Sequence, residues 1–133
     1  MIALMDMKEL TKAEEQIMQV LWKLEKALVK DIIEELPEPK PATTTVSTIV
    51  RILEKKEFVS HKAYGKNHEY FPLVSKDEYK KKFLKSFIKR YFGDSFQEMV
   101  SFFASRRDIS LRELEEIRRL LQDEISKQKD DTP

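Results

Sequence analysis

Residues 43–72 read TTTVSTIVRILEKKEFVSHKAYGKNHEYFP, and this stretch decides the fold. Its first half places apolar side chains at the i, i+3, i+4 and i+7 positions of an amphipathic helix from about Thr43 to Lys56. The apolar residues with this spacing are Val46, Ile49, Val50 and Leu53. Residues 58–64 and 68–71 are instead short β-prone runs on either side of Gly65-Lys66-Asn67, which predicts a hairpin with a tight turn. We therefore expect a helix followed at once by a two-stranded hairpin.

Two shorter helices are predicted before this stretch. The first begins at Thr11, and the second covers about residues 28–36 and ends at Pro37. The pattern Ser/Thr-x-x-Glu marks a helix start, because the hydroxyl accepts from the N3 amide while the Glu accepts from the cap amide. It occurs at Thr11/Glu14, Ser75/Glu78, Ser95/Glu98 and Ser110/Glu113. Met18 and Trp22, on the apolar stripe of the first helix, are interpreted as core residues.

Three further helices are predicted after the hairpin. They run from Ser75 to about Phe92, with Gly93 as a C-cap, and then over about 96–105 and 111–127. Three short helices followed by a hairpin is the element order of a winged helix-turn-helix. We therefore expect a mainly α fold with a small β-hairpin: a winged-helix DNA-binding domain at residues 1–74, then a helical dimerisation region at residues 75–133.

The helix before the hairpin is the one expected to enter the major groove, and it carries hydroxyl and basic groups that bind bases and phosphates. The expected DNA-binding residues of this helix are Thr43, Thr44, Thr45, Ser47, Thr48, Arg51 and Lys55, and those of the wing are Lys62 and Lys66. An ordinary solvated helix face is the alternative interpretation. Residues 40–70 hold six basic and three acidic side chains, a modest surplus that is compatible with contact with phosphates but does not by itself indicate nucleic-acid binding.

The region after Ser75 has apolar stripes that its short helices cannot bury alone, which favours dimerisation. The expected dimerisation residues are Phe83, Phe87, Tyr91, Phe96, Phe102, Phe103, Leu114, Ile117 and Leu121. The aromatic members of this set are alternatively the lining of an effector pocket. The lysine-rich run at residues 80–85 is either a second phosphate contact or a solvated face.

Composition excludes several classes of site. The chain has no cysteine, two glycines and two histidines, so a thiolate site, a phosphate-cradling glycine loop and a Ser/His/acid triad are not expected. His61 and His68 flank the hairpin turn and are expected to face each other in a structural role rather than bind a metal. We expect no enzyme activity, no cofactor, no direct membrane association, and a cytoplasmic location.

Three motifs resemble the BlaI/MecI/CopY family of bacterial penicillinase repressors. Leu10-Thr11-x-Ala13-Glu14-x-x-Ile17-Met18-x-x-Leu21-Trp22 is similar to the opening signature of the family. Residues 44–56 are similar to its recognition helix, and residues 65–72 to its wing turn and second wing strand. The resemblance covers roughly residues 10–127 in one register. At Lys56-Glu57 the family often has Lys-Gly, so the helix is expected to end in some other way.

The resemblance implies a homodimer that represses genes from a palindromic operator on double-stranded DNA. It also implies a membrane-bound sensor metalloprotease as a partner, with repression relieved by cleavage near Ser101-Phe102, where Ser101 replaces the usual Asn. The copper-binding C-terminal cysteines of one branch are absent. Two alternatives remain at this point: a winged-helix protein-interaction module without DNA binding, and a repressor controlled by a small molecule bound in the C-terminal aromatic cluster.

Overall fold

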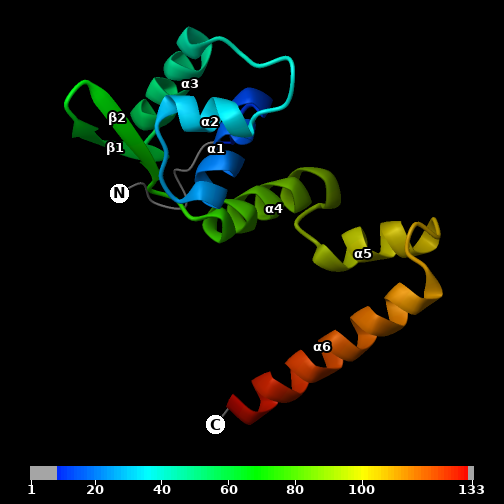
Figure 1. Cartoon of the computed structure of the whole chain (residues 1–133). Helices are drawn as coiled ribbons and strands as arrows, with labels where there is room; N and C mark the ends of the chain where they lie inside the picture. Colours follow the sequence, from blue (N-terminus) through cyan, green and yellow to red (C-terminus); the bar gives the residue numbers. More distant parts are fainter. Residues whose placement is uncertain (1–8, 132–133) are drawn as a thin grey trace. The chain divides into compact units, whose positions relative to one another are not determined.

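The computed structural model describes residues 9–131, so residues 1–8 and 132–133 of the two expected domains lie outside the described residues. It has six helices and one antiparallel hairpin in this range, which confirms the expected mainly α fold (Figure 1). In chain order these are α1 (Lys12–Leu24), α2 (Val29–Glu35), α3 (Thr43–Lys55), β1 (Val59–Tyr64), β2 (Asn67–Pro72), α4 (Lys76–Phe92), α5 (Phe96–Ser105) and α6 (Leu111–Asp131). The chain forms two compact units, Met1–Lys85 and Ser86–Pro133.

The four expected N-caps are all formed. In α1 the Thr11 hydroxyl accepts from the Glu14 amide at 3.2 Å, and the Glu14 carboxylate accepts from the Thr11 amide at 2.8 Å. The serine hydroxyls at the starts of α4, α5 and α6 accept from the amide of the glutamate three residues later. Since each cap satisfies backbone donors that a helix leaves unpaired, these local signals fix where the helices begin.

The core of the first unit is built from one apolar face of each of its helices and from the hairpin. The fully buried side chains include Ile17, Met18 and Leu21 of α1, Ile32 of α2, Val46, Val50 and Leu53 of α3, and Phe58 and Val59 at the start of the hairpin. Trp22 is half-buried and packs against this core, and its indole Nε1 donates to the carbonyl of Val74 at 2.9 Å. The interpretation of Met18 and Trp22 as core residues is confirmed.

The hairpin is held in two places. Tyr64 pairs with Asn67, so Gly65 and Lys66 form a two-residue turn, and Gly65 has the positive φ of 60° that favours glycine at the first central position. Tyr70 of β2 also exchanges both backbone hydrogen bonds with Ala27, at 2.8 and 2.9 Å. Because Ala27 lies just before α2, this bridge fixes the wing beside α2 as well as beside α3.

The end of α3 differs from the expectation that, without a glycine after Lys56, the helix would end in some other way. The amide of Phe58 donates to the carbonyl of Leu53 at 2.9 Å, and the amide of Glu57 donates to the carbonyl of Glu54 at 3.0 Å. These two bonds form a Schellman motif, in which the residue after the cap is left-handed and is usually glycine. Glu57 has a φ of 67°. The helix therefore ends in the way a Lys-Gly sequence would end it, with a glutamate in the strained position.

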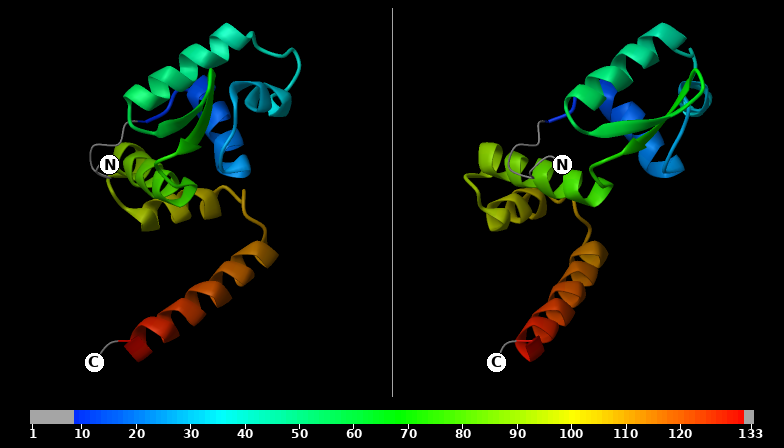
Figure 2. Two further views of the ribbon diagram at one scale, coloured as in Figure 1. Left: turned by 60° about the vertical axis from the view of Figure 1, so that its left-hand side comes forward. Right: turned by 90° about the vertical axis from the view of Figure 1, so that its left-hand side faces the viewer.

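The first part of α4 packs with the first unit, which therefore continues past the expected boundary at residue 74. Tyr79 is buried against Phe58 and Trp22, and its hydroxyl accepts from the backbone amide of Leu10 at 2.9 Å. Burial raises the pKa of Tyr79. In both views of Figure 2, α3 lies above the hairpin and the first turns of α4 lie below it.

The second unit contains the end of α4 together with α5 and α6. None of residues 86–131 is fully buried, although many are large and apolar. Tyr91 and Phe96 are 66% and 61% exposed. No helix within residues 9–131 has the length and apolar composition to cross a membrane.

Candidate nucleic-acid interface

The outward face of α3 carries hydroxyl and basic side chains in one stripe. Thr44, Thr48, Arg51 and Lys55 are exposed and recur at i, i+4, i+7 and i+11, which is the spacing of a single helix face. Thr43 and Thr45 are also exposed, and Ser47 is half-buried, so these three flank the stripe. Six of the seven expected α3 residues are therefore exposed and Ser47 is half-buried, and the stripe of four lies on the side opposite Val46, Val50 and Leu53.

Thr48 has a defined hydrogen-bonding role on this face. Its hydroxyl donates to the carbonyl of Thr44, one turn earlier, at 2.9 Å. Because this bond uses the hydroxyl proton, Thr48 offers an acceptor oxygen and a methyl group to a partner rather than a donor. A methyl group on a recognition helix is suited to contact with the methyl group of thymine.

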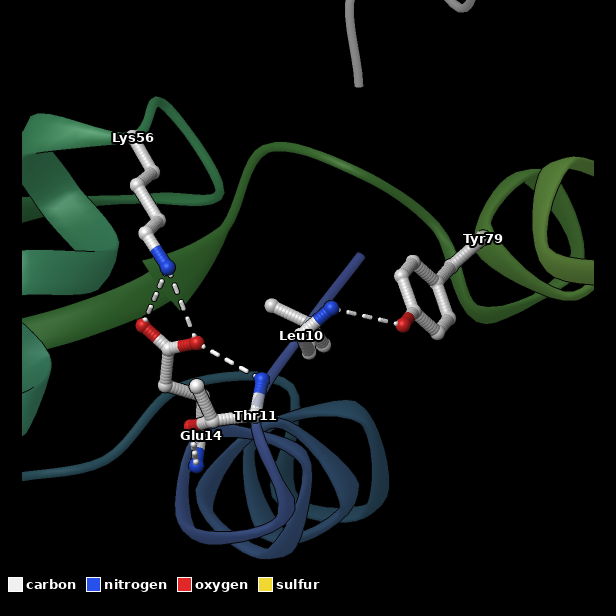
Figure 3. Close-up of polar contacts among 5 residues, drawn as sticks. All are labelled: Leu10, Thr11, Glu14, Lys56 and Tyr79. Carbon is white, nitrogen blue, oxygen red and sulfur yellow. Dashed lines mark hydrogen bonds and ion pairs between the residues drawn. The ribbon is translucent and has the colours of Figure 1, made fainter. Parts of the chain in front are cut away.

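A partly buried ion pair fixes the end of α3 to the start of α1. The ammonium Nζ of Lys56 lies 2.8 and 3.0 Å from the two carboxylate oxygens of Glu14 (Figure 3). Burial alone would raise the pKa of Glu14, but hydrogen bonds from Lys56 and Thr11 outweigh it and hold the pKa below 4.5. The carboxylate is thus charged at neutral pH, and α3 is anchored against α1.

The wing presents two lysines and one aromatic ring. Lys62 and Lys66 are exposed, as expected of residues that contact phosphates. Tyr64 is 51% exposed, and the Lys62 ammonium lies 5.5 Å from the centre of its ring. Tyr64 was not among the expected interface residues, although its alternation with Lys62 along β1 was a signal that both side chains share the outer face of the strand.

A hollow of about 390 Å³ lies between α2, α3 and the wing turn. Its lining includes Ser47 and Arg51 from α3, Lys66 and Asn67 from the hairpin, and Lys30 from α2. Tyr70, which is nearly buried and whose pKa is raised by that burial, also lines it. Ser47, Arg51 and Lys66 were among the expected DNA-binding residues, whereas Lys30 and Asn67 were not. No local pattern identified Lys30, because the pairing of Ala27 with Tyr70 is what places α2 beside the wing. Asn67 was named in the predicted turn but not as a DNA-binding residue.

The two histidines lie together, as expected. Their rings stack with centres 4.2 Å apart and planes 11° from parallel, and Nδ1 of His61 lies 2.7 Å from Oε2 of Glu54 on α3. These contacts link the wing to α3. Residues 9–131 contain no group of three or more His, Cys, Asp or Glu side chains arranged to hold a metal ion.

The expected dimerisation residues differ in their surroundings. Phe83 packs against the core of the first unit and its ring lies 6.2 Å from that of Tyr79, so it is not part of an open apolar surface. Phe87 and Leu114 are half-buried, whereas the others are exposed: Tyr91, Phe96, Phe102, Phe103, Ile117 and Leu121. The expected cleavage residues Ser101 and Phe102 are exposed and lie inside α5.

Comparisons with known proteins identify relatives of this chain. The family model described as penicillinase repressor matches residues 10–123. The methicillin resistance regulatory protein MecI of Staphylococcus aureus (strain N315) is 33% identical over 114 residues, which cover 85% of this chain and 93% of that protein. The penicillinase repressor of Staphylococcus aureus is 30% identical over 122 residues, which cover 90% of this chain and 94% of that protein.

The solved structures that resemble the chain include the solution structure of the DNA-binding domain of the repressor BlaI. It has 26% sequence identity and a TM-score of 0.49, and the match covers 55% of this chain and 90% of that chain. The assignment rests on the sequence comparisons, since the family model spans most of the chain and the relatives align over nearly their whole length. This chain therefore belongs to the penicillinase repressor family.

Proposed function

We propose that this protein is a transcriptional repressor that binds double-stranded DNA through α3 and the wing. The observation that carries the proposal is the exposed stripe of Thr44, Thr48, Arg51 and Lys55 on α3, with the basic wing beside it. In a winged helix-turn-helix the second helix of the motif lies in the major groove and the wing lies against the backbone. The relatives are named as a regulatory protein and a penicillinase repressor, which supports a repressor rather than an enzyme.

We further propose that the repressor acts as a homodimer on a palindromic operator. The second unit supports this proposal, because none of its residues 86–131 is fully buried while Tyr91, Phe96 and Phe102 expose aromatic rings. A second copy of the chain would cover such a surface. It would also hold two α3 helices at a spacing suited to successive turns of the major groove, about 34–36 Å apart.

Relief of repression by proteolysis is the proposed signal response, with a membrane-bound sensor metalloprotease as the protease. The bond between Ser101 and Phe102 lies in a helix, so its cleavage requires local unwinding of α5. The experiment is co-expression with the sensor and inducer, followed by mass spectrometry of the repressor. A new C-terminus at Ser101 supports the proposal, and an intact chain under conditions that induce the target genes contradicts it.

DNA binding is tested by selecting duplexes from a random-sequence library with the full-length protein. The selected operator is then titrated with the wild type and with Thr44→Ala/Thr45→Ala/Thr48→Ala/Arg51→Ala. Because all four side chains are exposed, this variant should keep its fold and lose operator binding. Failure to enrich any sequence, or unchanged binding by the variant, would remove α3 from the proposed interface.

A small-molecule effector site is the second candidate for regulation. A hollow of about 750 Å³ in the second unit is lined mainly by aromatic rings, and Arg106 also lines it. The Arg106 guanidinium lies 3.7 Å from the centre of the Phe102 ring. Glu98 also lines this hollow, so an apolar pocket with one cation and one carboxylate would suit an aromatic or aliphatic ligand that carries polar groups. Thermal-shift screening with the full-length protein tests this candidate: stabilisation by a ligand that also releases DNA would support it over proteolysis.

A further inference from the structure

The hollow between α2, α3 and the wing turn collects positive charge from three separate elements. Lys30 comes from α2, Arg51 from α3 and Lys66 from the hairpin turn. No acidic residue lines this hollow. Within residues 9–131, none of these three cations has a carboxylate within ion-pair distance, whereas Lys23, Lys56 and Lys80 elsewhere in the chain each have one. Three cations that converge without a counter-charge favour an anion as the missing partner.

The neutral groups of the hollow are also suited to an anion. The side chains of Thr43 and Ser47 supply hydroxyl donors and that of Asn67 supplies an amide donor. Phosphate has several acceptor oxygens directed to different sides, so it can accept from donors on α2, α3 and the hairpin at once. A lysine acts on it as a point charge, and hydroxyl and amide groups position it.

The position of the hollow indicates which kind of molecule would supply that phosphate. It lies between the outward face of α3 and the wing turn, which are the two elements proposed to contact DNA. A duplex that occupies both elements passes over the hollow with its sugar–phosphate backbone. We propose that this hollow seats one phosphate group of the DNA backbone, which Lys30 and Lys66 hold together. The proposal rests on the proposed DNA-binding function and assigns Lys30, a residue of the first helix of the motif, to the interface.

The test uses the full-length protein and its selected operator, with a single neutral methylphosphonate placed in turn at each backbone position. For the wild type, one position in each half-site should weaken binding by about tenfold, because one charge-assisted contact is lost. Lys30→Ala and Lys66→Ala should each bind the unmodified operator more weakly than the wild type. In both variants, a methylphosphonate at that same position should cause no further loss of binding. Lys76→Ala, an exposed lysine at the start of α4 that does not line the hollow, should keep the wild-type pattern.

The proposal that Lys30 and Lys66 hold the same phosphate would be overturned if the two alanine variants lost their response to the methylphosphonate at different backbone positions. It would also be overturned if Lys30→Ala responded to the methylphosphonate at every position as Lys76→Ala does. In either case operator binding by the wild type would leave the proposed repressor function standing. If the wild type bound no duplex, that function would fail instead, and the hollow would be tested alone by titrating inorganic phosphate at constant ionic strength. Saturable amide shifts at Ser47, Lys66 and Asn67 that disappear in Lys30→Ala would support a seat for free phosphate, and their absence would overturn it.

Discussion

The ammonium group of Lys56, just after α3, lies 2.8 Å from Oε2 of Glu14 in the first turn of α1. The Glu14 side chain is 6% exposed and that of Lys56 is 27% exposed, so the pair is largely removed from water. Glu14 also accepts from the Thr11 amide and thereby caps α1. One carboxylate thus starts the first helix and anchors the end of the helix proposed to read DNA.

Replacement of Lys56 should destabilise the protein, because a buried carboxylate without a counter-charge is costly. Lys56→Met keeps the aliphatic stem and should lower the free energy of unfolding by about 3 kcal/mol. Lys55→Met, at the exposed neighbouring position, should change it by less than about 0.5 kcal/mol. Urea denaturation measures both. The double variant Glu14→Gln/Lys56→Met should lose less than the sum of the single variants, and strict additivity would mean that the pair is not coupled.

The same pair gives a pH dependence whose sign follows from the pKa of Glu14. The folded-state pKa lies below its ordinary value of 4.5, so the stabilisation is fully present above 4.5. It is lost as the pH falls through the folded-state pKa, since the unfolded state then binds more protons. The gap in unfolding free energy between the wild type and Glu14→Gln should therefore shrink on acidification from pH 7 to pH 3. A gap that stayed constant or widened would contradict the depressed pKa.

Glycine at position 57 should stabilise the protein. Glu57 has a φ of 67°, a conformation that costs a residue with a Cβ about 1–2 kcal/mol relative to glycine. Glycine loses about 0.5–1 kcal/mol more backbone entropy on folding, so Glu57→Gly should raise the free energy of unfolding by about 0.5–1 kcal/mol. Glu57→Ala removes the carboxylate but keeps the strain and should give no such gain. Equal stabilisation by both variants would assign the effect to charge.

The features that the sequence predicted correctly depend on residues only a few positions apart. The caps at Thr11, Ser75, Ser95 and Ser110, the turn at Gly65 and the outward face of α3 all follow from hydrogen bonding or periodicity within one or two helical turns. Glu57 shows the limit of such rules. The local sequence disfavours a left-handed residue there, but burial of Phe58 and Leu53 on either side of the motif holds the backbone in it.

The features that the sequence did not predict all depend on contacts between distant segments. Lys56 and Glu14 are 42 positions apart. Tyr79 places the first turns of α4 in the first unit because its hydroxyl meets the amide of Leu10, 69 positions away. Lys30 lines the hollow because Ala27 pairs with Tyr70. Periodicity identifies the face that a helix exposes, but it does not identify which other element that face meets.

Substitutions of Arg51 should show whether its guanidinium recognises a base or contributes only positive charge. Arg51→Ala should weaken binding to the selected operator by about 1–3 kcal/mol if the guanidinium reads a base. Arg51→Lys keeps the positive charge but lacks the planar pair of N–H donors, so it should retain binding to a random duplex and lose affinity for the operator. Fluorescence anisotropy at one salt concentration compares the two duplexes. Full operator affinity in Arg51→Lys would show that Arg51 contributes charge alone.

Residues 76–85 of α4 belong to the first unit, whereas α5 and α6 belong to the second. Truncation after α4 should therefore separate the folding of the winged helix from dimerisation. A fragment of residues 1–92 keeps Tyr79 and should be folded and monomeric, since it lacks α5 and α6. A fragment of residues 1–74 loses the hydrogen bond from Leu10 to Tyr79 and uncovers Trp22 and Phe58, so it should unfold at markedly lower urea concentration.

Affinity for DNA should fall in the 1–92 fragment even though its α3 and wing are intact. Two tethered modules bind through effective concentration, so the loss of the second copy should weaken operator binding by roughly 10²–10⁴-fold while a single half-site is still bound. Sedimentation equilibrium and titration of full and half operators measure the two effects on the same sample. A dimeric 1–92 fragment, or one that bound the full operator as tightly as the intact chain, would place the dimer contacts before residue 93. Removal of the C-terminal helices, by truncation or by proteolysis at Ser101, would then no longer explain release from DNA.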